Sequence, residues 1–361
     1  MYKHRSETIY IDSDVRNTQK KNSKVDTVAT SKGSGPRMAD VAAAAGVSLV
    51  TVSRVINEPG KVSPVTLALV REAIERLGYV PNLMAGSLAS NRTRIVAAIV
   101  PTISNSVFSE TVEGLANALH AGGYQLLLGQ ASYQADEEQQ LVEAFLGRRV
   151  DGLVLTGEPL SAQLAQRLRK LGVPVVQTWD LPSRPIDMVV GFSNQAAGAA
   201  AASYLIRKGH THMGFIGAAE TRAKQRLQGF WEAVAGVGLP RVESEMTPPP
   251  VTVDQVAVHL NAMLQRRPEL DAVFCNNDQL AAGVLFECRR QGLDVPGRLA
   301  VIGFGDLPIA TAASPQLTTV RIDRKGMGRT AGELLLDRFS GSGQLDAVTD
   351  LGFTVVERES A

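Results

Sequence analysis

Several polar residues directly follow apolar segments, where they are able to bind a ligand. Asp180 ends the segment VVQTWD, and the pair Asn277-Asp278 ends the segment AVFCNND. Carboxylate and amide groups bind hydroxyl groups well. Arg226, in the segment RLQGF, offers a guanidinium fork that matches a carboxylate, although an ordinary surface ion pair is the alternative. This set fits a polyhydroxy acid better than a neutral hydrocarbon.

Motifs for nucleophilic or phosphoryl-transfer chemistry are missing from the sequence. It contains neither a phosphate-binding G-x-x-x-x-G-K-[ST] loop nor a G-x-S-x-G elbow, and no nucleophile–base pair stands out. His210-Thr211-His212 lacks a third metal ligand, so a solvated turn is the simpler interpretation. We therefore expect no enzyme activity, no metal and no cofactor. A cytoplasmic α/β enzyme using Asp180, Asp278 and Arg226 is the alternative.

The elements that must position these residues alternate along the chain after residue 94. Apolar runs predict strands over 94–101, 124–129, 152–156, 173–178, 188–191, 213–217, 272–275, 299–304 and 354–357. Helical patterns lie between them, over 108–121, 136–147, 161–171, 196–207, 223–235, 253–265, 279–291 and 325–339. This alternation predicts parallel sheets with right-handed crossovers. So many strands favour two doubly wound lobes, with a ligand cleft between them at the carboxyl ends of the strands.

A different pattern fills the segment before residue 90. The segment 38–45 is a short Ala-rich helix that Gly46 ends, and Ser48 can cap a second helix over 49–57. A third helix begins after Ser63, with Pro64 in its first turn, and ends at Gly78. Two short helices joined by a tight turn predict a helix-turn-helix.

The second of these helices has two distinct faces. Val52, Val55 and Ile56 share the side that packs on the first helix, whereas Val50, Arg54 and Asn57 lie opposite, with Ser53 on the flank. The second set is free to reach base edges and phosphates, as a recognition helix must.

Composition and charge limit the class of protein. With 361 residues, 44% of them hydrophobic and 20% charged, the chain fits a soluble protein of two or three domains. No apolar run is long enough for a membrane span, and the polar N-terminus is no secretory signal, so we expect a cytoplasmic protein. Cys275 and Cys288 lie in apolar segments and are expected to be free buried thiols.

The net charge of +1 hides a modest local surplus of basic residues in and around the helix-turn-helix segment. A surplus of this size suits a dimer in which two copies of the segment share the contact with DNA. Within 37–92 the basic residues Arg37, Arg54, Lys61, Arg71, Arg76 and Arg92 outnumber the acidic residues Asp40, Glu58, Glu72 and Glu75. Residues 1–35 are polar and rich in Lys, Ser and Thr. They are interpreted as a disordered extension or, equally, as an artefact of an upstream translation start.

Residues 38–88 resemble the headpiece of the lactose-repressor (LacI) family of bacterial transcription regulators. The family signature DVA-x-x-AGVS-x-x-TVSR-x-x-N is matched by 40–57, and its Tyr-x-Pro-Asn signature by 79–82. The later segments resemble the effector domain of the family, which is similar to periplasmic sugar-binding proteins. The resemblance implies a headpiece over 36–81, a hinge helix or linker over 82–93, an effector-binding and dimerisation core over 94–357 and a tail over 358–361. It divides the core into one lobe of 94–192 with 322–350 and another of 193–321 with 351–357.

The resemblance also implies the residues that touch DNA. Leu49 and Val50 stand where the family usually sets operator specificity, and apolar side chains suit thymine methyl groups; a place at the core edge is the alternative for Leu49. In the family a hinge leucine, here Leu88, enters the minor groove as an apolar wedge; an ordinary linker residue is the alternative. The full expected set is Leu49, Val50, Thr51, Ser53, Arg54, Asn57, Lys61, Asn82 and Leu88.

The same resemblance places an effector among residues of both lobes. The chain departs from many relatives after Gly-Phe, where it has Gly305 followed by Asp306 instead of an aspartate directly; Asp306 either substitutes for that aspartate or points away. Segments such as VFSETVEGL, DMVVGFSN and FECRRQGL are similar to the gluconate-operon repressor branch, which implies gluconate or a close sugar acid. The expected effector-binding residues are Val107, Phe108, Asp180, Phe192, Arg226, Asn277, Asp278 and Asp306.

Together these observations predict a repressor that binds a near-palindromic operator as a homodimer and responds to a sugar acid. The family's tetramer-forming C-terminal helix has no counterpart after residue 357, which favours a dimer. Another sugar or a sugar phosphate as effector, or a cytoplasmic sugar-binding protein, are the alternatives. The sequence leaves open whether the effector releases DNA or promotes its binding.

Overall fold

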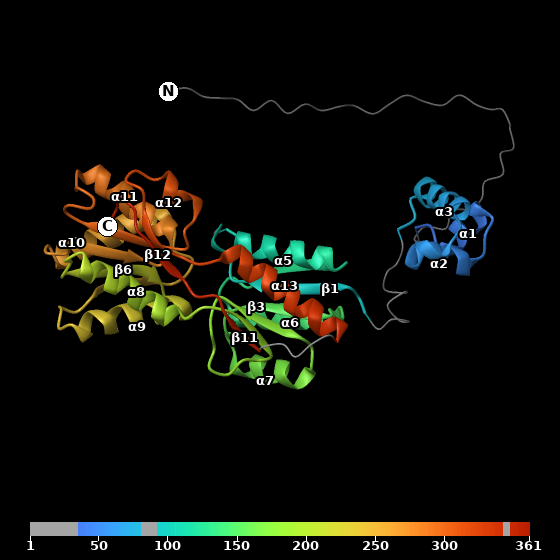
Figure 1. Cartoon of the computed structure of the whole chain (residues 1–361), viewed down its shortest axis with the longest axis horizontal. Coiled ribbons are helices and arrows are strands. Elements are labelled where there is room, and N and C mark those ends of the chain that lie inside the picture. Colours follow the sequence, from blue (N-terminus) through green and yellow to red (C-terminus); the bar gives the residue numbers. More distant parts are fainter. Residues whose placement is uncertain (1–34, 81–91, 105, 342–346) are drawn as a thin grey trace, which may run out of the picture. The chain divides into compact units, whose positions relative to one another are not determined.

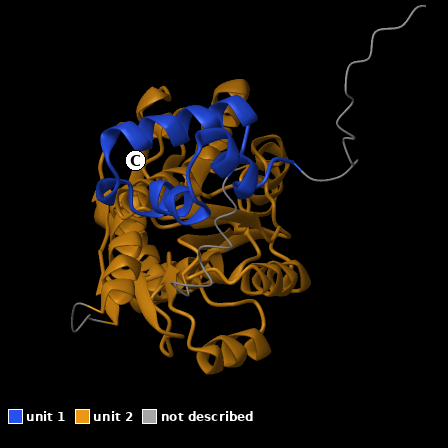
Figure 2. Ribbon diagram, turned by 90° about the vertical axis from the view of Figure 1, so that its right-hand side faces the viewer, with its two compact units in different colours: residues 1–86 blue, residues 87–361 orange. Residues whose placement is uncertain are grey.

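The computed structural model describes residues 35–80, 92–104, 106–341 and 347–361. Contacts between residues divide the chain into two compact units, residues 1–86 and residues 87–361 (Figure 2). The predicted positions Asn82 and Leu88, and most of the predicted hinge over 82–93, lie outside the described residues. The two units are described separately below.

The first unit contains three helices whose ends follow the predicted signals. They are α1 (Met38–Ala45), α2 (Leu49–Asn57) and α3 (Pro64–Leu77), with a short 3₁₀ turn, η1 (Pro59–Lys61), between the last two. Ser48 and Ser63 cap α2 and α3 by accepting backbone N–H groups, and Gly46 and Gly78 end α1 and α3 in the left-handed conformation. A small apolar core holds them together, formed by Val41, Ala42, Val52, Val55, Val70, Ala73 and Tyr79.

The second unit contains two six-stranded sheets, each forming the centre of one lobe (Figure 1). The sheet of lobe 1 has the order β11-β5-β4-β3-β1-β2 and is parallel throughout. Its strands are β1 (Ile95–Val100), β2 (Gln125–Gln130), β3 (Gly152–Thr156), β4 (Val175–Thr178), β5 (Met188–Gly191) and β11 (Val348–Asp350). Strand β1 packs on both faces, because Val96 and Ala98 join one apolar cluster and Ala97 and Ile99 another.

The sheet of lobe 2 has the order β12-β10-β9-β8-β6-β7. Its strands are β6 (Met213–Ala218), β7 (Glu243–Thr247), β8 (Ala272–Cys275), β9 (Ala300–Phe304), β10 (Thr318–Arg321) and β12 (Thr354–Val356). All neighbours are parallel except β12, which runs antiparallel to β10 at the edge. The prediction of two doubly wound α/β lobes after a helical headpiece is thus confirmed, with this one antiparallel strand as a departure.

Helices cover both faces of each sheet (Figure 1). Those of lobe 1 are α5 (Ser109–Ala121), α6 (Ala135–Gly147), α7 (Ala162–Leu171) and α13 (Arg324–Ser340). Those of lobe 2 are α8 (Asn194–Arg207), α9 (Thr221–Gly236), α10 (Val256–Arg266), α11 (Asp278–Gln291) and the short α12 (Pro308–Ala312). Each lobe also contains a 3₁₀ turn, η2 (Ser106–Phe108) in lobe 1 and η3 (Val253–Gln255) in lobe 2. Strands β7, β10 and β11 and helix α12 were absent from the prediction.

Close packing of α8 on α9 fixes the backbone beneath the cleft between the lobes. A Cβ atom at Gly198 would lie 1.9 Å from the carbonyl oxygen of Arg226, and one at Gly229 would lie 1.9 Å from that of Gln195. Only glycine permits this approach of two helices. The backbone of Arg226 is therefore held by direct helix–helix contact.

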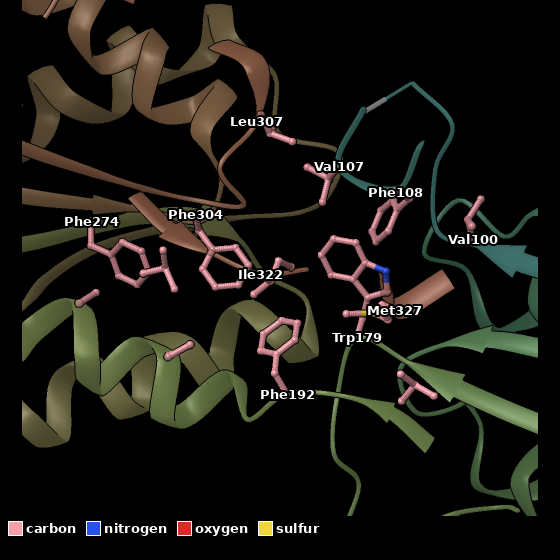
Figure 3. Close-up of a cluster of buried hydrophobic side chains, with 14 of the residues drawn as sticks. Val100, Val107, Phe108, Trp179, Phe192, Phe274, Phe304, Leu307, Ile322 and Met327 are labelled. Carbon is pink, nitrogen blue, oxygen red and sulfur yellow. The ribbon is translucent and has the colours of Figure 1, made fainter. Parts of the chain in front are cut away.

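Aromatic side chains form a buried row where the two lobes meet (Figure 3). The ring centroids of Phe108 and Trp179 are 4.9 Å apart, and those of Phe192 and Phe304 are 5.8 Å apart. Trp179 also contacts Phe192, edge to face. The row belongs to one apolar cluster that contains residues of both lobes.

Within the described part of the chain, no single helix is long and apolar enough to cross a membrane. The bent pair of α1 and α2, with 104° between its helices, meets that criterion by length and composition only when counted together.

Candidate functional site

A cleft of about 550 Å³ lies between the two lobes. Its walls include segments that directly follow strands, namely Thr102 after β1, Tyr133 after β2, Asn276 and Asn277 after β8, and Leu307 after β9. The cleft therefore lies at the carboxyl ends of the strands, where doubly wound sheets bind their ligands. Its other wall residues are Ser104, Ser106, Ser109, Glu110, Ala218, Pro249, Pro250, Val251, Thr252, Val253, Gln279, Leu280, Ala282, Phe286, Pro308, Ile309 and Arg324.

Arg226 lies beneath the cleft and is almost completely buried. It lines a small cavity of about 30 Å³ that shares Tyr133, Asn276 and Asn277 with the main cleft. Its guanidinium donates hydrogen bonds to the side-chain oxygens of Asn276 and Asn194. Burial lowers the pKa of Arg226 to about 10, so the side chain stays protonated at neutral pH.

Arg222 and Glu220 complete this charged group, and neither was among the predicted site residues. Arg222 precedes Arg226 by one helical turn on α9, so both project from the same face. The Glu220 carboxylate lies 3.4 Å from Arg222 and 3.6 Å from Arg226, and it also accepts two N–H groups at the start of α9. The i, i+4 spacing of the two arginines was the signal that could have revealed Arg222.

Asp180 lies at a second chamber, of about 210 Å³, on the other side of Arg222 and Tyr133. Its carboxylate accepts hydrogen bonds from Asn194, from Gln225 at 3.1 Å and from its neighbouring backbone N–H. The structure thus places Asp180 near the charged group but does not place it on the wall of the main cleft.

Asn277 and Asp278 are neighbours in the sequence but lie in different surroundings. Asn277 lines the cleft and also caps α11 by accepting the N–H of Leu280 at 3.0 Å. The prediction that Asp278 faces the ligand is not supported, because its side chain is fully buried behind the cleft wall. There it accepts hydrogen bonds from the Thr319 hydroxyl and the Leu307 N–H, both at 2.5 Å. Its neighbour Asn276, which bonds Arg226, takes the expected place beside Asn277.

Asp306 also points away from the cleft. Its two carboxylate oxygens accept hydrogen bonds from Arg321 at 2.5 Å and from Arg358 at 2.6 Å. These arginines lower the pKa of Asp306 even though its partial burial opposes that shift. Asp306 was expected among the effector-binding residues, and this expectation requires correction: of its two alternatives, the geometry favours the one in which the side chain points away. Its backbone oxygen accepts a hydrogen bond from the wall residue Arg324.

The predicted apolar positions Val107, Phe108 and Phe192 occupy two different places in the structure. Val107 and Phe108 line the small cavity beneath the cleft together with Trp179 and Phe304. Phe192 is fully buried behind them, in contact with Trp179 and Phe304, and lines none of the cavities described above. It supports the floor of the site rather than forming it.

Direct hydrogen bonds join the lobes across the cleft. Gln279 of lobe 2 donates to the Ser106 hydroxyl of lobe 1 at 3.1 Å. Arg222 donates to the carbonyl oxygen of Thr156 at 3.0 Å, and Gln225 donates to Asp180. These bonds connect the two lobes directly beside the space that a ligand would occupy.

Arg324 and Glu110 are two further wall residues that were missed. Arg324 is the first residue of α13 and is 4% exposed. It donates to the Glu110 carboxylate at 2.9 Å and to the Asp306 carbonyl oxygen at 3.3 Å. They are 214 positions apart in the sequence, so no local pattern could reveal the pair.

Helix α2 of the first unit, which the sequence predicts to be a recognition helix, carries several of the predicted DNA-contact residues on its exposed side. Leu49 and Val50 are 51% and 62% exposed, and for Leu49 this exposure argues against a place at the edge of the core. Arg54 is exposed as well. Of the other predicted contacts, Thr51 bonds to Ser48, Asn57 donates to Ser53, and Lys61 lies 3.3 Å from Glu58.

The remaining polar groups suggest no second centre. Among the described residues, no cluster of three or more His, Cys, Asp or Glu side chains is placed to hold a metal ion. The turn 210–212 is fastened by Asp271, which accepts the N–H groups of Thr211 and His212. Cys275 and Cys288 are free and buried, as predicted.

Comparisons with known proteins match both parts of the chain. Residues 37–82 match the family "Bacterial regulatory proteins, lacI family", and residues 202–361 match a periplasmic binding protein-like domain. The regulator GntR of Pseudomonas aeruginosa is 36% identical over 90% of this chain and 95% of its own length, and GntR of Escherichia coli (strain K12) is 34% identical over 89% and 97%. The crystal structure of a LacI-family regulator from Silicibacter pomeroyi has a TM-score of 0.84 at 32% identity, covering 90% of this chain and 99% of that one.

Proposed function

The chain belongs to the lacI family of bacterial regulatory proteins, in the branch of the GntR transcriptional regulators, and from this premise we propose that it is a repressor controlled by a sugar acid. The matched relatives are regulators rather than enzymes. Gluconate is the effector that we propose. The observation that carries this choice is the position of Arg226, buried beneath the cleft beside Asn276 and Asn277.

The chemistry of the cleft supports a monoanionic polyol. Arg222 and Arg226 both pair with Glu220, and the buried Asp180 carboxylate also acts on Arg226 electrostatically. The two guanidinium groups can bind a ligand carboxylate in a buried environment, where charge-assisted hydrogen bonds are strong. Asn276, Asn277 and the serine hydroxyls of the opposite wall offer donors and acceptors for a chain of hydroxyl groups.

The first unit supplies the DNA-binding part of the proposal. We place α2 in the major groove, with Leu49 and Val50 against base edges and Arg54, Thr51, Ser53, Asn57 and Lys61 among bases and phosphates. Asn82 and Leu88 are proposed to act at the minor groove, as the family resemblance implies. The protein would work in the cytoplasm, where its operator lies.

A homodimer is the proposed assembly. The resemblance to the dimerisation core of the family carries this proposal, and Val258 on α10 is an apolar side chain of lobe 2 that lies exposed outside the cleft. Two headpieces would then bind the two halves of a near-palindromic operator.

Effector control follows from the bonds between the lobes. Gluconate among Arg226, Asn277 and Gln279 would favour one arrangement of the lobes over another, and only such a difference in affinity can shift the equilibrium. The dimer would pass this shift to its two headpieces and change their affinity for DNA.

Calorimetric titration with D-gluconate, run beside D-glucose, tests the effector. We expect gluconate alone to bind, and binding to be lost in Arg226→Ala. Binding of glucose, or of neither compound, would contradict the choice of a sugar acid. DNA binding is tested separately by deletion of residues 1–90, which should abolish DNA binding and leave gluconate binding intact.

A further inference from the structure

We propose that Glu110 and Arg324 form a second recognition site in the cleft, which binds the uncharged terminal hydroxyl of the sugar acid and rejects ligands with a second negative charge. This inference rests on the proposed sugar-acid function and names the ligand more narrowly. It concerns the part of the cleft that the predicted contacts leave unassigned.

Both residues belong to the wall of the main cleft, whereas Arg222 and Arg226 line the cavity beneath it. Asn276 and Asn277 border both spaces, so they lie between the two charged groups. A ligand that places its carboxylate at Arg226 and its hydroxyl groups along these asparagines would therefore extend toward Arg324. The far end of an open-chain sugar acid is a CH₂OH group.

Arg324 has unused hydrogen-bonding capacity. Its Nη2 atom donates to Glu110 and to the Asp306 carbonyl oxygen, but its buried Nε atom has no hydrogen-bond partner among the residues that the structure describes. A buried donor without a partner is unfavourable, so native structures rarely retain one without a reason. Because Arg324 borders the cleft, a ligand oxygen that accepts a hydrogen bond from its guanidinium would add a partner to a group whose donors are not all used.

Glu110 sets the charge that this site accepts. Its carboxylate pairs with Arg324 at 2.9 Å, so the positive charge of the arginine is already balanced. It lies in the first turn of α5, where the helix dipole favours a carboxylate. A hydroxyl group can donate to Glu110 and accept from Arg324, whereas a phosphate or second carboxylate would face the repulsion of Glu110 at short range.

The two ends of the cleft differ in their charged groups. Two arginines, Arg222 and Arg226, lie at the end proposed for the ligand carboxylate, with Glu220 and Asp180 as the carboxylates near them. At the other end Arg324 is paired directly with Glu110, which borders the cleft itself. A ligand with one acid group and one neutral end suits this arrangement. This arrangement achieves specificity partly through a repulsive group directed at the wrong ligand.

The test is a calorimetric titration of the full chain with D-gluconate, 6-phosphogluconate and D-glucarate. We expect the wild type to bind gluconate at least about 10-fold more tightly than either doubly charged compound. Glu110→Gln removes the repulsive charge and leaves Arg324 unneutralised, so the preference for gluconate should shrink by about 10-fold or more.

Glu113→Gln is the matched control. Glu113 lies on the same helix, pairs with Lys325 at 2.7 Å and is not part of the cleft wall, so its substitution should leave all three affinities nearly unchanged. A ratio of affinities is used because a loss of folded protein would reduce the binding of every ligand equally.

The outcomes separate the two proposals. Equal binding of gluconate and 6-phosphogluconate by the wild type, or an unchanged preference in Glu110→Gln, would overturn the role of the Glu110–Arg324 pair while the sugar-acid function stands. Failure of all three compounds to bind would overturn both.

Discussion

The guanidinium carbon of Arg226 lies 4.3 Å from the centroid of the Phe304 ring. A cation above an aromatic face is stabilised by the ring quadrupole. Phe304 is itself the last residue of β9 and packs on Phe192, so the position of the arginine is set by the core of lobe 2. The residue that we propose to bind the effector carboxylate is therefore held rigidly before any ligand arrives.

Replacement of Arg226 by lysine should weaken gluconate binding by about 100-fold, because lysine keeps the charge but loses the planar fork and its stacking on Phe304. Isothermal titration calorimetry measures the change. Gln228→Ala is a suitable control, since Gln228 is exposed on the same helix. An affinity for gluconate within about 2-fold of wild type in Arg226→Lys would contradict a bidentate contact.

The packing of α8 on α9 gives a prediction about stability. Gly198→Ala would place a Cβ atom 1.9 Å from the carbonyl oxygen of Arg226, so the helices must separate. We expect the free energy of unfolding to fall by about 2–3 kcal/mol, as for an overpacked core, measured by urea denaturation. Gly236→Ala, at the end of α9 with no atom within 4 Å of the new Cβ, should leave stability unchanged or slightly raise it. Equal stability of the two variants would show that the helices adjust freely.

Local signals in the sequence were sufficient for the headpiece. The serine caps at 48 and 63 and the glycines at 46 and 78 mark the end of α1, the start of α2 and both ends of α3, and each acts through neighbours three to five residues away. Strand β7 was missed because ESEMT has no apolar run, and it pairs on one side only, at the sheet edge. Such a strand is defined by its neighbour β6 rather than by its own composition.

The candidate site was predicted only in part, for a similar reason. Asn277 lies on the wall of the cleft and Arg226 lies beneath it, but Asp278 and Asp306 are held by Thr319 and Arg358, which are 41 and 52 positions away. Those partners turn both carboxylates away from the cleft. A residue type at the end of a strand therefore predicts the location of a side chain better than its direction.

Val50 on α2 gives a prediction about DNA recognition. Val50→Ala should lower the affinity for the preferred operator, obtained by selection from random sequences, by about 10-fold, because one apolar contact to a base edge is lost. Affinity for unrelated DNA at the same salt concentration should not change, since that binding depends on phosphate contacts. Fluorescence anisotropy measures both affinities. Val65→Ala, which removes an exposed valine from α3 instead, is the control; equal effects of the two substitutions would contradict readout by α2.

The buried carboxylate of Asp278 makes stability depend on pH. Burial raises its pKa to about 6 from an ordinary value of 3.8, although the hydrogen bonds from Thr319 and Leu307 partly offset this shift. Because the folded state holds the proton more tightly than the unfolded state, Asp278 favours folding most below pH 4, and this contribution is lost as the pH rises toward 6 and above. A shift of about 2 pH units corresponds to about 3 kcal/mol.

We therefore expect wild-type protein to lose about 3 kcal/mol of unfolding free energy relative to Asp278→Asn between pH 4 and pH 7, with no further change above pH 7. Urea denaturation of both proteins across this range measures the unfolding free energy of each. Subtracting the value for Asp278→Asn from that for wild type at each pH cancels the contribution of the other titrating groups. Asp337→Asn, at an exposed position on α13, is the control, and its unfolding free energy should change with pH in the same way as that of wild type. A difference between wild type and Asp278→Asn that stays constant with pH, or grows in favour of wild type as the pH rises, would show that the Asp278 carboxylate is already charged in the folded protein at pH 4.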